Sequence, residues 1–324
     1  MHNPAPDTDP AEAVAAIGNR IAAEVSRVVL GKPAVVRLAV TALLAEGHLL
    51  LEDVPGVGKT TLARALAATV RGAWRRIQFT PDLLPADVTG VTVFHQGTGA
   101  FEFHPGPVFG NIVIADEINR ASPKTQSALL EVMEERHVTV DGTRHPVPRP
   151  FLVVATQNPI EMDGTYRLPE AQLDRFLMRL AVGYPDEDVE VEVLRGAAAR
   201  SPDDLAPVTD TAAVAEVIAL ARTTYIADPL YTYAVRVAAA TRTHPRVRLG
   251  VSPRGVIALT RAASAYALLA GRRYVIPEDL RDLMPAVFTH RLILSPEAEL
   301  RGITAAAVLA EAIESVPVPV PAAA

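Results

Sequence analysis

The sequence predicts an α/β protein in which a parallel sheet flanked by helices is followed by a smaller, all-helical domain. Three observations carry this prediction. Apolar runs of strand length alternate with helical periodicities up to residue 186. A glycine-rich turn joins the first of these runs to a helix. Beyond residue 186 the chain is alanine-rich with helical period and has almost no strand signal.

Length and composition are those of a globular protein of about two domains. The 324 residues are 49% hydrophobic and carry a formal net charge of −6, which does not point to a nucleic-acid-coating surface. The absence of cysteine rules out a disulfide framework and thiolate zinc sites. No apolar run reaches the roughly 18 residues of a membrane helix, and the polar start lacks an apolar signal core. We therefore expect no membrane span and a cytoplasmic location.

The elements of the first domain, residues 11–186, follow from periodicity and breakers. Two helices come first, because apolar residues recur at helical spacing on both sides of the break at Leu30-Gly31-Lys32-Pro33. They are expected over 11–29 and 33–45. Strands are expected at 48–52, 74–79, 112–115 and 151–155, with a helix to Val70 after the first.

Two segments of this domain are predicted to be hairpins. One runs from Val91 to Phe103, and the other runs from Val138 to Val147 with a turn at Asp141-Gly142. The aromatic residues of the first hairpin are either partner contacts or its own packing face: Phe94, Phe101 and Phe103.

Three further segments complete the predicted organisation. Residues 1–10 are polar and proline-rich and are expected to be disordered. Residues 187–315 form the all-helical domain. Residues 316–324 form an extended, proline-rich tail, because alternating Val and Pro cannot continue a helix.

A candidate phosphate-binding loop lies between the strand at 48–52 and the next helix. It reads Asp53-Val54-Pro55-Gly56-Val57-Gly58-Lys59-Thr60-Thr61. Glycines let backbone amides approach phosphates, and a helix N-terminus favours their negative charge. Lys59 would reach the β- and γ-phosphates of ATP, and Thr60 would hold Mg²⁺. Asp53 stands where the usual pattern has glycine, and an ordinary Gly-Lys-Thr helix start is the alternative.

Polar residues also follow two other predicted strands. Asp116 and Glu117 end the run 112–115, where Asp116 would bind Mg²⁺ and Glu117 would deprotonate the attacking water. Asn158 follows the run 151–155 and could hydrogen-bond the γ-phosphate or that water. Each feature alone could be a solvated strand end or a turn. Together they fall at the carboxyl ends of strands, where open α/β sheets bind ligands.

Several blocks resemble the MoxR family of AAA+ ATPases almost word for word. They are Leu49–Thr61, Phe101–Ile118, Leu168–Phe176 and Ser252–Gly255, in the right order within residues 25–290. The resemblance implies an AAA+ core with a helical lid, a homo-oligomeric and often hexameric ring, and nucleotide held between subunits.

The resemblance also implies roles for residues outside the three strand ends. Arg175 resembles the arginine finger that reaches a neighbour's γ-phosphate, and Arg254 resembles the lid arginine called sensor 2. The segment that includes Val29 and Gly31 resembles the stretch that packs on adenine. The two hairpins resemble inserts that face the pore of the ring. Without the family match, Arg175 would be interpreted as a surface arginine near a helix end, and Arg254 as an arginine in the first turn of a helix.

Three functions are weighed on these grounds. The first is an ATP-hydrolysing, chaperone-like factor that assembles protein complexes or matures their metal cofactors, with a von Willebrand factor A domain protein as partner. The second is a helicase-like nucleic-acid motor, against which the acidic charge and the lack of a basic or zinc module weigh. The third is a binding module with little turnover. The client protein cannot be read from the chain.

Two other features are set aside. The eight histidines include no pair with a metal-binding spacing such as His-Glu-x-x-His, and His104 receives no role. The pairs Arg75-Arg76 and Arg272-Arg273 are expected to be solvated.

Overall fold

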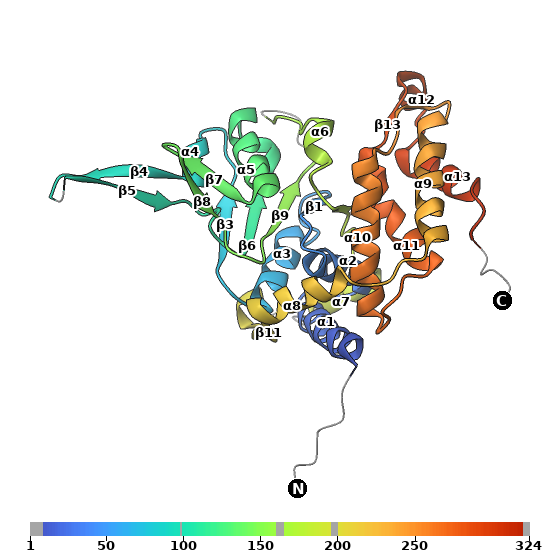
Figure 1. Ribbon diagram of the computed structural model, residues 1–324, viewed down its shortest axis with the longest axis horizontal. Helices are drawn as coiled ribbons and strands as arrows, with labels where there is room; N and C mark the ends of the chain where they lie inside the picture. Colours follow the sequence, from blue (N-terminus) through green and yellow to red (C-terminus); the bar gives the residue numbers. More distant parts are fainter. Residues whose placement is uncertain (1–8, 98, 160–164, 196–199, 320–324) are drawn as a thin grey trace, which may run out of the picture.

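A five-stranded, all-parallel sheet forms the centre of the first domain in the computed structural model, which describes residues 9–97, 99–159, 165–195 and 200–319 (Figure 1). The strand order is β10-β1-β9-β6-β3. The strands are β1 (Leu49–Glu52), β3 (Trp74–Gln78), β6 (Ile112–Asp116), β9 (Leu152–Gln157) and β10 (Met178–Leu180). The predicted parallel sheet is confirmed, with β10 as a fifth strand that the sequence did not reveal.

Both faces of the sheet are covered by helices. Along β1, Leu49 and Leu51 join one hydrophobic cluster while Leu50 joins the other, because successive strand residues point to opposite faces. The first cluster holds α1 (Pro10–Ser26), α2 (Pro33–Leu44) and α3 (Lys59–Ala68), and the second holds α5 (Pro123–Glu135). Burial on both sides explains why the runs in β1, β6 and β9 are continuously apolar rather than alternating.

The first helix begins earlier than the sequence suggested. The carboxylate of Asp9 accepts a hydrogen bond from the backbone amide of Ala11 at 2.9 Å, and Pro10 opens α1. The prediction that residues 1–10 are disordered is therefore wrong for Asp9 and Pro10, because an Asp-Pro pair is a helix start. Residues 1–8 lie outside the described part of the chain.

Both predicted hairpins are present. Strands β4 (Gly90–His95) and β5 (Ala100–Pro105) pair antiparallel, as do β7 (His137–Val140) and β8 (Thr143–Pro146). At the second turn Asp141 and Gly142 have φ values of 48° and 76°, the left-handed pair that this turn needs. The β4–β5 hairpin follows the short helix α4 (Pro85–Thr89) and projects far from the body of the molecule (Figure 1).

The C-terminal part is mainly helical and forms the lid. Its helices are α7 (Glu187–Leu194), α8 (Thr211–Ala221), α9 (Asp228–Thr243), α10 (Pro253–Leu269), α11 (Pro277–Phe288), α12 (Pro296–Leu300) and α13 (Ala305–Glu314). α10 packs against both α1 and α2, so that lid and core share one apolar cluster. No helix among the described residues is long and apolar enough to cross a membrane.

The lid is not helical throughout. β12 (Val247–Leu249) pairs with β13 (Ile293–Leu294) within it. β11 (Thr209–Asp210) pairs with β2 (Val70–Arg71) of the core. These strands of two or three residues are too short to show an alternation in sequence. The expectation that residues 187–315 contain only helices is corrected by these short strands. The described part of the tail, residues 316–319, contains no helix or strand.

Candidate active site

The polar residues predicted at three strand ends lie in one cleft. It has a volume of about 360 Å³ and sits where β1, β6 and β9 end. Its lining includes Pro55, Gly56, Gly58, Lys59, Thr60, Thr61, Asp116, Glu117 and Asn158. Three neighbouring parallel strands thus bring together residues that are about 100 positions apart in the chain.

The loop after β1 has the backbone that a phosphate cradle requires. Gly56 and Gly58 have φ values of 84° and 91°, a left-handed conformation that glycine adopts readily. Gly58 is the N-cap of α3 and has no side chain to cap it, so the first amides of the helix are available to phosphate oxygens. The Lys59 ammonium donates to the carbonyls of Asp53 and Val54 beside the cleft.

Asp53, the departure from the usual glycine, ties this loop to the end of the sheet. Its carboxylate accepts hydrogen bonds from the backbone amides of Val54 at 2.7 Å and of Gly183 at 2.6 Å. Gly183 lies three residues after the end of β10, the edge strand that pairs with β1. Asp53 therefore joins the phosphate loop to the segment that leads into the lid, a role that glycine could not fill.

The arrangement around Asp116 fits a Mg²⁺ ion bound through oxygen. Thr60 Oγ1 donates to Asp116 Oδ1 at 3.0 Å, so the two predicted ligands lie side by side. Hydroxyl and carboxylate oxygens are the donors that Mg²⁺ prefers. Arg76 Nε lies 2.7 Å from Asp116 Oδ2. Arg76 is exposed, as expected, but it is also ion-paired, because β3 lies beside β6 and places the two side chains together.

Glu117 holds an unusual backbone conformation at the edge of the cleft. Its φ is 56°, which is uncommon for a residue other than glycine and is often found where function demands it. Its amide donates to Thr156 Oγ1 at 2.9 Å, and its Oε2 accepts from Gln78 and Arg120, both at 2.9 Å. These contacts hold the carboxylate at the cleft.

A second cleft adjoins the phosphate loop on its other side. It has a volume of about 410 Å³, shares Gly56, Gly58 and Thr61 with the first, and is lined by Val28, Val29 and apolar residues of α7. Gly31 lies against α7, where a Cβ would come within 2.9 Å of Val189. Lys32 and Arg200 also line this cleft. A cleft with apolar walls that continues from a phosphate loop has the position and chemistry required for adenine.

Arg175 and Arg254 do not line either cleft of their own chain. Both contact Glu134 near the C-terminal end of α5, each at 2.8 Å. Burial raises the pKa of Glu134, but the hydrogen bonds and charges of Arg254 and Arg175 outweigh it and hold that pKa below its ordinary value. Glu134 is therefore ionised at neutral pH and holds the two cations together.

Sequence reasoning missed several residues that position these groups. Arg291, which is buried in the 3₁₀ helix η4 (Thr289–Arg291), pairs with Asp174 Oδ1 at 2.6 Å and donates to the carbonyl of Phe176 at 2.7 Å. It thereby fixes the segment that carries Arg175, which follows α6 (Glu170–Leu173). Gln78 and Thr156 likewise hold Glu117. The only available signal for Gln78 and Thr156 was their place at the ends of predicted strands.

Comparison with known proteins agrees with this geometry. Residues 48–178 match the model of the ATPase family associated with various cellular activities (AAA), and residues 239–312 match that of the AAA lid domain. An uncharacterised Bacillus subtilis protein, YeaC, is 53% identical over 91% of this chain and 93% of its own. The Mycobacterium tuberculosis chaperone MoxR1 is 42% identical over 91% of this chain and 81% of its own.

A solved structure agrees over almost the whole length of the chain. The crystal structure of a candidate ATPase from Cytophaga hutchinsonii superposes with a TM-score of 0.88 at 37% identity, covering 96% of this chain and 97% of that one. Sheet order, helical lid, both family matches and the full-length relatives agree. The chain belongs to the MoxR family of AAA+ ATPases.

Proposed function

We propose that this protein binds ATP with Mg²⁺ and hydrolyses it to ADP and phosphate, and that it uses this cycle to remodel protein complexes. The observation that carries the proposal is the convergence of Lys59, Thr60, Asp116, Glu117 and Asn158 on one cleft at the ends of three adjacent strands. A second cleft with largely apolar walls, suited to the base, adjoins it. A phosphate-binding cleft next to a cleft for a base fits a nucleoside triphosphate better than a small anion such as free phosphate.

Each residue has a distinct part in the proposed reaction. The loop amides and Lys59 hold the β- and γ-phosphates, and Thr60 and Asp116 hold the metal, which supplies positive charge to the phosphate oxygens. Glu117 accepts a proton from the attacking water, whose oxygen bonds to the γ-phosphorus as the bond to the ADP oxygen breaks. Asn158, 6% exposed at the end of β9, orients the water or the γ-phosphate.

The two arginines are assigned to a neighbouring subunit's nucleotide. Arg175 and Arg254 lie together but away from the cleft that contains Lys59, so within one chain they do not complete the site. We infer a ring, hexameric by analogy with the family, in which both arginines of one protomer contact the γ-phosphate of the next.

A chaperone-like role in assembly or metal-cofactor maturation is the proposed use of the cycle, in the cytoplasm and alongside a partner with a von Willebrand factor A domain. The M. tuberculosis relative is named a chaperone, which supports this role. The client, meaning the protein complex that the ATPase would remodel, is the next thing to identify. A Glu117→Gln protein that holds ATP without turning it over would retain the client for isolation.

Turnover of Glu117→Gln is the decisive test. The amide keeps the shape of the side chain but cannot take a proton, so ATP binding should persist while phosphate release falls about 10²–10⁴-fold. Glu131→Gln, a change of the same kind on an exposed residue of α5, should retain the wild-type rate. A Glu117→Gln rate within a few-fold of wild type would remove Glu117 as the base. Duplex DNA should not raise the wild-type rate, whereas clear stimulation would favour a helicase-like motor.

A further inference from the structure

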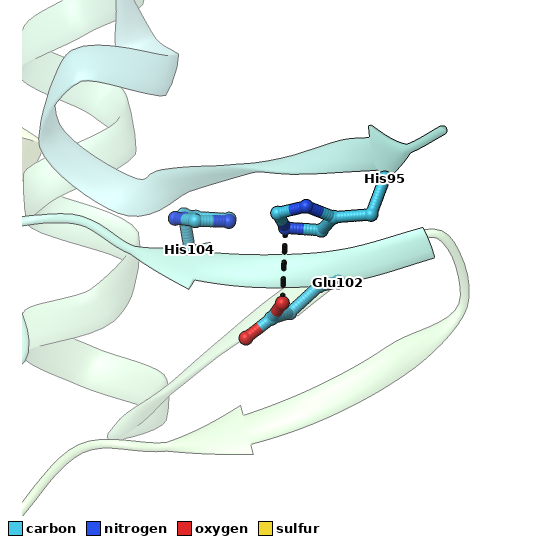
Figure 2. Close-up of side chains that lie close together, drawn as sticks. All are labelled: His95, Glu102 and His104. Atoms are coloured by element: carbon cyan, nitrogen blue, oxygen red, sulfur yellow. Dashed lines mark ion pairs between the residues drawn. The ribbon is translucent and has the colours of Figure 1, made fainter. Parts of the chain in front are cut away.

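The projecting β4–β5 hairpin carries two histidines and a glutamate on one face. In the strand register Val91 pairs with His104, Val93 with Glu102, and His95 with Ala100. These six residues share a face because side chains alternate along each strand. Figure 2 shows the two imidazole rings side by side, with the Glu102 carboxylate against His95.

The three side chains already lie close together. His95 Nε2 is 3.0 Å from Glu102 Oε2, and the rings of His95 and His104 stack with centroids 5.7 Å apart. One ligand atom from each residue lies within 4.8 Å of the other two.

A His–Glu ion pair alone would not account for the second imidazole. Such a pair uses His95 and Glu102, whereas His104 stands two residues from Glu102 on the same strand and presents a further nitrogen to the same point. Two imidazoles and one carboxylate are a set of three protein ligands found in zinc sites that keep an open position. Spacing along the chain did not reveal the set because its members come from two strands.

We propose that His95, Glu102 and His104 bind one divalent transition-metal ion of the Zn²⁺ class, with water in the fourth position. Zinc bonds of about 2.0–2.1 Å in a tetrahedron place ligand atoms about 3.3 Å apart. The ligand atoms must therefore approach by up to about 1.5 Å from their 4.8 Å limit. All three residues are exposed, so their side chains can turn while the paired backbone keeps its register.

This site is separate from the proposed magnesium site in position and in chemistry. None of the residues that line the phosphate cleft belongs to β4 or β5. Thr60 and Asp116 offer hard oxygen donors, whereas imidazole nitrogens favour zinc and related ions over Mg²⁺. Binding of Zn²⁺ at the hairpin therefore does not depend on ATP hydrolysis, and the two can be measured apart.

The test is calorimetric titration of the untagged, full-length protein with Zn²⁺ in excess Mg²⁺. We expect one Zn²⁺ per chain. His95→Ala, Glu102→Gln and His104→Ala should each weaken binding at least about tenfold, since each removes one of three ligands. His145→Ala is the matched control: His145 lies on β8 and stacks on Phe103, which points to the opposite face of the hairpin, so it should leave the affinity unchanged.

A second measurement reports the coordination itself. Co²⁺ bound in place of Zn²⁺ should give the intense visible absorption of a tetrahedral site in the wild-type protein and lose it in His104→Ala. The proposal is overturned if Zn²⁺ does not bind, or if all three variants bind it as the wild type does. It is equally overturned if His145→Ala loses as much affinity as His104→Ala. Unchanged ATP turnover in His104→Ala would confirm that any loss is local to the hairpin.

Discussion

Arg175 and Arg254 bind opposite oxygens of one carboxylate, although they are 79 positions apart and come from the core and the lid. Arg175 Nε lies 2.8 Å from Glu134 Oε2, and Arg254 Nη1 lies 2.8 Å from Glu134 Oε1. The pair presents two guanidinium groups at one point on the surface. Such a pair can contact several oxygens of a γ-phosphate at once, if that phosphate belongs to a neighbouring chain.

Replacing Glu134 with glutamine should lower the ATP turnover of the assembled protein without changing ATP affinity. Glu134 lines neither of the two clefts, but it holds both of the arginines that are proposed to contact a neighbour's phosphate. Loss of partly exposed ion pairs is worth about 1 kcal/mol, which corresponds to about fivefold in rate. Steady-state kinetics should show a lower kcat with KM for ATP nearly unchanged.

Glu131→Gln is again the control, because it removes a carboxylate from the same helix one turn earlier. It should retain the wild-type kcat. Equal or faster turnover in Glu134→Gln would mean that Glu134 does not position the arginines for catalysis, and a large rise in KM would place its effect at nucleotide binding instead.

Lys59→Ala should abolish tight ATP binding. Lys59 supplies the cation of the phosphate loop itself, at the start of α3 and in the same cleft as Asp116. Charge-assisted contacts to phosphate are among the strongest hydrogen bonds in proteins, and alanine removes both the charge and the donor. Titration with a fluorescent ATP analogue measures the loss. An affinity equal to that of the wild type would show that phosphate is bound elsewhere.

The centre of the sheet could be predicted from sequence because β1, β6 and β9 are buried on both faces and so contain continuous apolar runs. β10 was missed because it contains only three residues and Arg179 interrupts its apolar pattern. Arg179 is accommodated there by an ion pair with Glu52 at 3.0 Å, a partner 127 positions away. No local window of sequence contains that information.

The candidate site likewise contains residues that could be predicted from the sequence and contacts that could not. Lys59, Asp116 and Asn158 could be found because motif residues follow strands directly, and parallel topology then brings them together. The pairing of the exposed Arg76 with Asp116 could not be predicted, because the two residues lie on adjacent strands and neither segment of sequence reveals the strand order. The contact of Arg175 with Glu134 depends on how the segment after α6 approaches α5, where Gln172 also donates to Ser127 Oγ at 3.3 Å. The resemblance could suggest a role for Arg175 but not this contact.

Stability should fall in mild acid partly because of His48. His48 is buried, with Nε2 3.0 Å from the Met133 carbonyl and Nδ1 accepting from the Val153 amide at 3.0 Å. Burial, followed by the charge of Arg136, lowers its pKa to about 3. The unfolded chain takes up this proton near pH 6.5 while the folded chain does not, so protonation favours unfolding as pH falls from 6.5 towards 3.

The expected contribution is about 2 kcal/mol of unfolding free energy lost between pH 7 and pH 5, at about 1.4 kcal/mol per pH unit below the ordinary histidine pKa. Urea denaturation at both pH values measures it. His48→Gln should be less stable at pH 7 but should lose less stability on acidification. Leu129→Ala, which opens a cavity without removing a titrating group, should keep the wild-type pH dependence. Equal dependence in His48→Gln and wild type would contradict the assignment.

Two inactive variants should restore activity to each other if Arg175 acts on a neighbour's nucleotide. The Lys59→Ala chain retains Arg175, and the Arg175→Ala chain retains Lys59. In a head-to-tail ring some interfaces join those two intact halves, and random equal mixing makes about a quarter of them complete. ATP turnover should therefore appear when the two proteins are mixed under conditions that allow subunit exchange.

A second mixture tests whether the recovery comes from shared sites. Lys59 and Glu117 line the same cleft of one chain, so mixing Lys59→Ala with Glu117→Gln cannot create a complete site and should leave turnover at background. Recovery only in the first mixture assigns Arg175 to the interface and makes the oligomer the catalytic unit. If Lys59→Ala and Arg175→Ala chains co-assemble, shown by pull-down of one through a tag on the other, yet no turnover returns, Arg175 either acts within its own chain or is not the finger.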